Sequence, residues 1–235
     1  MTDQPAKARR RYEPATEAEP ADLLIVDDHP IVRRGLVELI NHEKDLNVCA
    51  DVSGAHEALD VLKQHIPHMC IIDLTLEGIG GLDLIKQVKS LYKDLPMLVL
   101  SMHDESVYAE RALRGGAKGY IMKQAGADNL LVAIRKVLRG EVYVSDAMAS
   151  RMLGAYVGDK GTTDKSPIDR LSDRELEVFE LIGQGLGSRQ IAEKLCVSIK
   201  TIESHREHIK EKLNLKNAAE LVQRAVQWGQ SQGTT

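Results

Sequence analysis

Five short apolar runs alternate with amphipathic stretches through the first half of the chain. The runs cover residues 23–26, 46–50, 69–72, 97–100 and 119–122. Near-continuous runs of this length are typical of parallel strands that are buried on both faces of a sheet. The amphipathic stretches include residues 31–40, 55–66, 82–91 and 130–138. The alternation predicts a doubly wound α/β domain with a five-stranded parallel sheet.

The rest of the chain divides into three further segments. Residues 1–20 contain Pro5, Pro14 and Pro20 with few large apolar side chains, which is typical of a disordered tail. The basic run at 7–11 in that tail is either a nucleic-acid arm or a solvated segment. The α/β domain occupies 21–145, and the glycine-rich stretch 146–168 is expected to be a linker. Residues 169–235 have only helical patterns and form a second domain.

Composition limits the class of protein. The chain has 235 residues, 43% of them hydrophobic and 28% charged, which suits a soluble globular protein. It has neither an apolar run long enough to span a membrane nor an apolar N-terminal secretion signal. Cys49, Cys70 and Cys196 are scattered without metal or redox spacing, as in a reducing compartment. We therefore expect a cytoplasmic protein with no membrane partner.

Ionisable side chains stand at the ends of four of the five predicted strands. Asp27 and Asp28 follow the first strand, Asp73 the third, Ser101 the fourth and Lys123 the fifth. The carboxyl ends of parallel strands meet in one crevice, so these side chains are expected to lie together. Each residue taken alone would more often be an ordinary cap at a strand end. Their coincidence at one edge of the sheet favours a functional site.

Three carboxylates in one crevice repel each other unless a cation intervenes. Mg²⁺ bound through carboxylates and water would relieve the repulsion and offset the charge of an incoming phosphoryl group. Asp73 is the natural nucleophile, because an aspartate can form an acyl phosphate. Lys123 and the Ser101 hydroxyl could each bind a phosphoryl oxygen. The sequence therefore predicts a magnesium-dependent phosphoacceptor site.

The sequences around these residues resemble the receiver domain of two-component response regulators. The segments are LIVDDHP at 24–30, IIDL at 71–74, LVLS at 98–101 and KGYIMK at 118–123. The resemblance implies the sheet order 2-1-3-4-5 of a flavodoxin-like fold, the order that the chemotaxis receiver has in this class. It also implies Asp73 as phosphoacceptor, Asp27 and Asp28 as metal ligands, and a metal-binding backbone carbonyl at Thr75. Relatives often have asparagine at the position of Thr75, and many have proline at the position of Glu77.

Tyr120 stands at the family's aromatic switch position. The resemblance implies that Ser101 turns towards the phosphoryl group and that Tyr120 moves into the vacated space. The alternative is that Tyr120 is simply a half-buried strand residue.

An enzyme with an aspartyl-phosphate intermediate is the main alternative to a switch. Phosphatases of the haloacid dehalogenase class have a second aspartate two residues after the nucleophile, but here that residue is Thr75. The glycine-rich segment 183–189 lacks the lysine of a Walker loop. We therefore expect no enzyme, apart from the weak self-dephosphorylation of receivers.

The second domain has the pattern of a helix-turn-helix. Ser172 and Glu175 form a predicted capping box at the start of a helix that ends around 183–187. Ser188 is expected to cap a short second helix. A tight turn at 196–198 then leads to a third helix, in which Ile202, Ile209 and Leu213 fit the core. Two helices joined by so short a turn can place the second one in a DNA groove.

Residues 171–226 resemble the LuxR-type domain of the NarL/FixJ regulators, through the segments LSDRELEV, GQGLGSRQIA and VSIKTIESHR. The resemblance implies a four-helix domain and a promoter-binding homodimer on a two-fold site, controlled by a sensor histidine kinase. The fourth helix, over 217–228, and a face of the receiver would form the dimer contacts. His205 is either a phosphate contact or a packing residue. The expected DNA contacts are Arg189, Lys200, Thr201, Glu203, Ser204, His205, Arg206, Glu207 and Lys210.

The charge of the helical domain keeps a second function open. Residues 21–145 have 14 basic and 18 acidic residues, whereas 168–235 have 10 of each and a net charge of zero. Few phosphate contacts predict weak binding by a monomer, which dimerisation on DNA would offset. The alternative is a helical domain that recognises a protein. The predicted function is phosphorylation of Asp73 that switches dimerisation and promoter binding, and so regulates transcription.

Overall fold

A five-stranded parallel sheet forms the centre of the N-terminal domain in the computed structural model, which describes residues 19–157 and 167–232. The strands are β1 (Ala21–Val26), β2 (Leu46–Val52), β3 (Met69–Ile72), β4 (Met97–Ser101) and β5 (Gly119–Met122). They are arranged β2-β1-β3-β4-β5, and every neighbouring pair is parallel. The predicted α/β class and the 2-1-3-4-5 order are confirmed.

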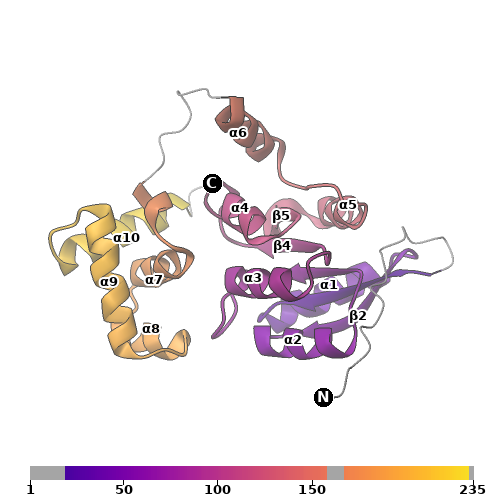
Figure 1. Ribbon diagram of the computed structural model, residues 1–235, viewed down its shortest axis with the longest axis horizontal. Helices are drawn as coiled ribbons and strands as arrows, with labels where there is room; N and C mark the ends of the chain where they lie inside the picture. The colour runs from indigo at the N-terminus through magenta and orange to yellow at the C-terminus, as the bar shows by residue number, and fades with distance from the viewer. Residues whose placement is uncertain (1–18, 158–166, 233–235) are drawn as a thin grey trace, which may run out of the picture.

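Helices cover both faces of this sheet (Figure 1). On one face lie α1 (Pro30–Asn41) and α5 (Ala127–Leu138), which follows the short 3₁₀ helix η1 (Lys123–Ala125). On the other face lie α2 (Ala55–Gln64), α3 (Gly81–Leu91) and α4 (Glu105–Gly115). Successive strand residues supply the two sides in turn: Leu23 and Ile25 pack under α1 and α5, and Leu24 and Val26 under the opposite layer. The strands are apolar throughout because both faces are covered.

The C-terminal domain is helical, as predicted. It comprises the short 3₁₀ helix η2 (Pro167–Arg170), α7 (Asp173–Gly183), α8 (Ser188–Lys194), α9 (Ile199–Leu213) and α10 (Ala218–Gln232). Ser172 and Glu175 form the predicted capping box of α7. The prediction for Ser188 was wrong: Gly187 is the N-cap of α8, and its backbone N–H donates to the Gln190 side chain at 2.9 Å.

Between the two domains, α6 (Asp146–Val157) extends the chain beyond α5 and contacts α4 (Figure 1). The part of the expected linker up to residue 157 is therefore helical. Residues 158–166 lie outside the described residues, as do residues 1–18 of the expected tail. Within the described ranges, every helix is too short or too polar to cross a membrane.

The helical domain is docked against α3, α4 and the loops that precede them. Arg111 of α4 donates to the Leu171 carbonyl at 2.7 Å and pairs with Asp173 at 2.9 Å. Lys86 of α3 pairs with the other oxygen of Asp173 at 2.6 Å. Burial raises the pKa of Asp173, but hydrogen bonds from Lys86 and Arg111 outweigh it and bring the pKa below the ordinary 3.8. The aspartate is therefore a charged anchor of α7 on the first domain.

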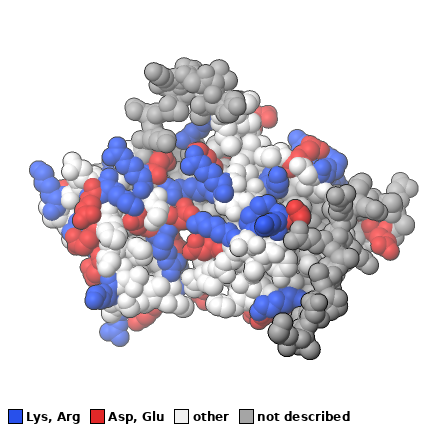
Figure 2. Space-filling model, viewed as in Figure 1, with Lys and Arg blue, Asp and Glu red and all other residues white. Residues whose placement is uncertain are grey.

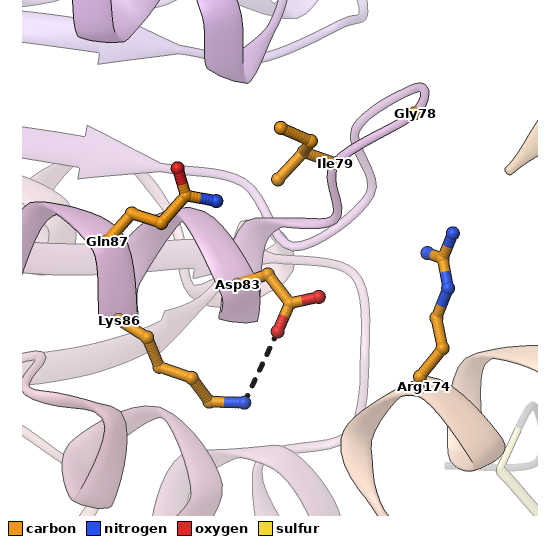
Figure 3. Close-up of a pocket in the computed structure, with 6 residues that line it drawn as sticks. All are labelled: Gly78, Ile79, Asp83, Lys86, Gln87 and Arg174. Carbon is orange, nitrogen blue, oxygen red and sulfur yellow. Dashed lines mark hydrogen bonds and ion pairs between the residues drawn. The ribbon is translucent and has the colours of Figure 1, made fainter. Parts of the chain in front are cut away.

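Next to this anchor the interface leaves a shallow hollow of about 360 Å³. Arg174 of α7 faces Asp83 and Lys86 of α3 across it, and the loop with Gly78 and Ile79 forms its rim (Figure 3). The same loop also approaches the turn between α8 and α9, since a Cβ atom on Gly78 would lie 3.8 Å from Cys196 Sγ. The segment between Asp73 and α3 is thus in direct contact with the second domain.

We predict that Gly81→Ala destabilises the protein by about 1–3 kcal/mol, because a Cβ atom there would lie 2.2 Å from the Asp73 carbonyl oxygen. Gly35→Ala is the control. Nothing lies within 4 Å of a Cβ atom at that exposed helical position, so it should stabilise by about 0.5–1 kcal/mol. Urea unfolding followed by circular dichroism measures both. Equal stabilities for the two variants would contradict the close approach of α3 to Asp73.

Candidate phosphoacceptor site and DNA interface

Lys123 joins two buried carboxylates at the carboxyl edge of the sheet. Its ammonium lies 2.7 Å from Asp27 Oδ2 and 2.7 Å from Asp73 Oδ2. Asp27 and Asp73 are each only 2% exposed. Burial lowers the pKa of Lys123, but the hydrogen bonds to the two carboxylates raise it by more than burial lowers it. The pKa of Lys123 is therefore above the ordinary 10.5. The lysine is therefore a permanent cation at Asp73.

Asp28 adds a third carboxylate to this pair. Burial raises its pKa, His29 lowers it, and the negative charges of Asp73 and Asp27 raise it again, with a net rise. His29 Nδ1 lies 2.6 Å from Asp28 Oδ1, yet that buried oxygen has no hydrogen-bond partner among the described residues. One ammonium cannot balance three carboxylates. Ligand atoms of Asp27, Asp28, His29 and Asp73 all lie within 4.8 Å of one another, so the donor set fits a hard divalent cation.

Ser101 at the end of β4 and Tyr120 of β5 share His103 as a hydrogen-bond partner. Ser101 is fully buried, and its hydroxyl oxygen accepts from the His103 backbone N–H at 3.3 Å. Tyr120 is also fully buried, and its hydroxyl donates to the His103 carbonyl at 2.8 Å. The tyrosine is thus deeper than the half-buried position considered above. The backbone N–H of Thr75 donates to Asp73 Oδ1 at 3.3 Å, and the Thr75 hydroxyl bonds to His103 Nε2 at 3.0 Å.

Helix α9, the predicted recognition helix, has an inner and an outer side. Ile202 and Ile209 are fully buried and Leu213 is partly buried, as predicted for core positions. Arg206 and Lys210 are mostly covered, and each lies next to a glutamate of the same helix, Glu203 at 3.9 Å and Glu207 at 2.9 Å. Of the other expected DNA contacts Thr201 and His205 are partly buried, and the exposed ones are Arg189, Lys200, Glu203, Ser204 and Glu207.

His205 points inwards, towards α7. Its Nδ1 atom is buried without a hydrogen-bond partner in the described part of the chain, and burial lowers its pKa. A ligand atom of His205 lies within 4.8 Å of one from Glu175 and one from His208. Lys212 already neutralises Glu175 at 2.6 Å, so this cluster has its own cation. The placement of His205 favours the packing interpretation over a phosphate contact.

Helix α10 has an inner and an outer apolar side. Leu221 and Ala225 are fully buried, and the helix packs mainly against α7. Val222 is 40% exposed and Ala218 is also exposed. The apolar stripe therefore serves the fold of its own domain on one side and leaves a small apolar surface on the other.

The sequence analysis missed His29, His103 and the docking residues Lys86, Arg111 and Asp173. His29 could have been found, because it directly follows the paired aspartates and histidine can bind metals. His103 and the docking residues had no such signal. Their roles depend on where the second domain rests, which no local pattern encodes.

Comparison with known families gives two matches along the chain. Residues 23–135 match the response regulator receiver domain, and residues 169–225 match the bacterial regulatory proteins of the luxR family. The two matched segments contain the carboxylate site and the helix-turn-helix respectively.

Relatives of known name match over most of the chain. It is 39% identical over 208 residues to the oxygen regulatory protein NreC of Staphylococcus haemolyticus, with 87% of this chain and 96% of the relative covered. RcsB of Salmonella enterica serovar Typhimurium, bound to promoter rprA with the phosphomimetic BeF3-, superposes with a TM-score of 0.62 at 28% identity, over 87% of this chain and 98% of that one. Another Salmonella typhimurium RcsB structure gives a TM-score of 0.67 at 27% identity, over 88% and 98%. The chain therefore belongs to the two-component response regulators that join a receiver domain to a LuxR-type helix-turn-helix domain and control transcription.

Proposed function

We propose that Asp73 accepts a phosphoryl group and that the resulting acyl phosphate controls promoter binding by the helix-turn-helix. The observation that carries this is the arrangement at the sheet edge. Asp73 is a buried carboxylate with an ammonium at 2.7 Å and two further carboxylates beside it. Lys123 and the Ser101 hydroxyl would bind phosphoryl oxygens. The phosphoryl donor is a sensor histidine kinase or a small acyl phosphate.

Mg²⁺ is the proposed cofactor, and receivers in general bind it at the phosphorylation site. Asp27, Asp28 and Asp73 would hold it here, with the backbone carbonyl of Thr75. The clustering of ligand atoms from Asp27, Asp28 and Asp73 within 4.8 Å of one another supports this donor set. When bound, the cation offsets the negative charge that gathers as the phosphoryl group reaches the carboxylate.

For the rest of the chain we propose a receiver over 21–145, a linker over 146–168 that includes α6 and the first two residues of η2, and a DNA-binding domain over 169–235. The protein would act in the cytoplasm, as a homodimer on a two-fold promoter site. Val222 and Ala218 on the outer side of α10 are the proposed contacts between DNA-binding domains. The exposed side chains of α9 would read the DNA. A uniformly basic surface is absent from the visible face, where both signs of charge are interspersed (Figure 2), so dimerisation has to supply much of the affinity.

Asp73→Asn is predicted to abolish phosphoryl addition, because an amide cannot form the acyl phosphate. The protein is incubated with Mg²⁺ and a small acyl-phosphate donor, and intact mass is measured for one added phosphoryl group. Asp60→Asn, at an exposed position on α2, is the matched control and should be phosphorylated normally. Addition that persists in Asp73→Asn would place the acceptor elsewhere.

We expect opposite changes in Mg²⁺ affinity for Lys123→Gln and Asp28→Asn. The first removes the ammonium that competes with the cation for Asp27 and Asp73, and so should tighten binding. The second removes a proposed ligand and should weaken binding by at least about tenfold. Calorimetric titration with Mg²⁺ measures both, with Lys118→Gln, exposed on the receiver, as control. Unchanged affinity in Asp28→Asn would remove Asp28 from the ligand set.

DNA binding by α9 is tested through its dependence on salt. Lys200→Ala should weaken binding to all sequences and lower the slope of log affinity against log salt by about one, because one phosphate contact is lost. Glu203→Ala should instead relax the choice of base and leave the slope unchanged. Mobility shifts at increasing salt, with and without phosphorylation, measure these effects. Absent or salt-insensitive binding in both states would favour a helical domain that recognises a protein.

A further inference from the structure

His103 is the one side chain within the described ranges 19–157 and 167–232 that we find bonded both to the loop after Asp73 and to the DNA-binding domain. Its Nε2 atom bonds to the Thr75 hydroxyl at 3.0 Å, and its Nδ1 atom lies 3.2 Å from Glu180 Oε1 on α7. Its ring lies against Tyr108 of α4, with ring centroids 4.7 Å apart. The imidazole is therefore fixed from the receiver side and extends to α7.

The backbone of the same residue is held by the two proposed switch side chains. The His103 N–H donates to the Ser101 hydroxyl oxygen, and the His103 carbonyl accepts from the Tyr120 hydroxyl. If Ser101 turns towards a phosphoryl group on Asp73, the first of these bonds is lost. Any such rearrangement of the β4–α4 loop moves the imidazole that contacts Glu180.

Docking at this surface places the receiver next to the start of the recognition helix. The loop at Gly78 approaches Cys196 Sγ, and Cys196 lies two residues before Ser198, the N-cap of α9. The N-terminal residues of a recognition helix are those that reach base edges in a helix-turn-helix complex. The receiver loop therefore lies against the turn that leads into α9, while Lys200, Glu203 and Ser204 of α9 stay exposed in the docked arrangement.

We propose that His103 is a positioning residue that couples the phosphorylation state of Asp73 to release of the DNA-binding domain. The inference rests on the proposed phosphoacceptor function and specifies how phosphorylation of Asp73 would alter docking of the second domain. Before phosphorylation, His103 connects the Asp73 loop to Glu180 and favours the docked domain. After phosphorylation, the β4–α4 loop rearranges around Ser101, the contact to Glu180 is lost and the equilibrium shifts towards the free domain.

A simpler route would need no relay at all. Phosphorylation adds negative charge at Asp73, and α7 presents Glu177 and Glu180 to the neighbouring loops. Repulsion alone could then undock the domain, and it would do so without the imidazole. The two routes differ in whether the response to phosphorylation survives the loss of His103.

The proximity of Gly78 and Cys196 provides a direct probe of docking. In a Gly78→Cys background, diamide should form a disulfide with Cys196 at a rate that follows the docked fraction. The positive φ at Gly78 strains any side chain there, but this strain is the same in all variants compared. Cys196→Ser in that background removes the cross-link and verifies its identity.

In the Gly78→Cys background, Mg²⁺ with beryllofluoride should slow cross-linking by about tenfold. Adding His103→Ala should slow cross-linking without beryllofluoride and reduce the response to less than about twofold. Arg111→Ala is the matched control, since Arg111 binds the docked domain but touches none of the proposed phosphoacceptor residues. It should also slow cross-linking but keep the tenfold response. His103→Gln, whose amide can donate to Glu180, should restore part of the response to beryllofluoride that His103→Ala loses.

A tenfold response that persists in His103→Ala would overturn the relay and favour direct repulsion. Phosphoryl addition measured by intact mass on the same proteins separates the two proposals. Addition without any change in cross-linking overturns the role of His103 and leaves Asp73 as phosphoacceptor. No addition to a folded protein overturns the proposed function, and the relay with it. Normal addition in His103→Ala shows that the substituted receiver is still folded.

Discussion

The rest of the structure depends on the ion pairs that Lys123 forms with Asp27 and Asp73 at the carboxyl edge of the sheet. A parallel sheet brings the ends of β1, β3 and β5 to one edge, and the residues there are two buried carboxylates and one ammonium. Burial of either carboxylate without a counter-charge would be costly. The lysine makes the arrangement stable, yet it leaves an excess of negative charge once Asp28 is counted. That excess is the basis of the proposal that the edge binds a divalent cation, which would then offset the charge of a phosphoryl group.

The same edge also supports the second domain. The loop after β3 runs from Asp73 past Gly78 to α3, and the loop after β4 contains His103, so both are anchored at the charged site and both reach α7. The close approach of Gly81 to the Asp73 carbonyl fixes the start of α3, from which Lys86 extends to Asp173. The proposed phosphoacceptor site at Asp73 and the docking surface for α7 therefore share the same short segments of backbone. The proposed coupling between the two sites would therefore act through a short stretch of backbone.

Most of the fold could be predicted from the sequence, and the docked arrangement could not. The strands could be predicted because a strand covered on both faces must be apolar along its whole length. The start of α7 could be predicted from the local capping pattern of Ser172 and Glu175. The clustering of the carboxylates could be predicted because the carboxyl ends of parallel strands meet at one edge of the sheet. The burial of Tyr120 and the position of His103 depend on contacts between segments far apart in sequence. Asp173 illustrates the limit: it reads as a first-turn acidic residue of α7 and is also the anchor for Lys86 and Arg111.

The docked arrangement also accounts for the zero net charge of the helical domain. Three acidic residues of α7 face the receiver, namely Asp173, Glu177 and Glu180. Lys86 and Arg111 pair with Asp173, and His103 lies next to Glu180. Glu175 is buried beneath Lys212. These four acidic residues serve the interface or the fold, and Arg174 and Lys212 pair with two of them. Of the ten basic and ten acidic residues, the remainder therefore has an excess of two basic residues. The zero net charge of the domain therefore does not describe α9 itself, because Asp173, Glu177 and Glu180 belong to α7 and face the receiver.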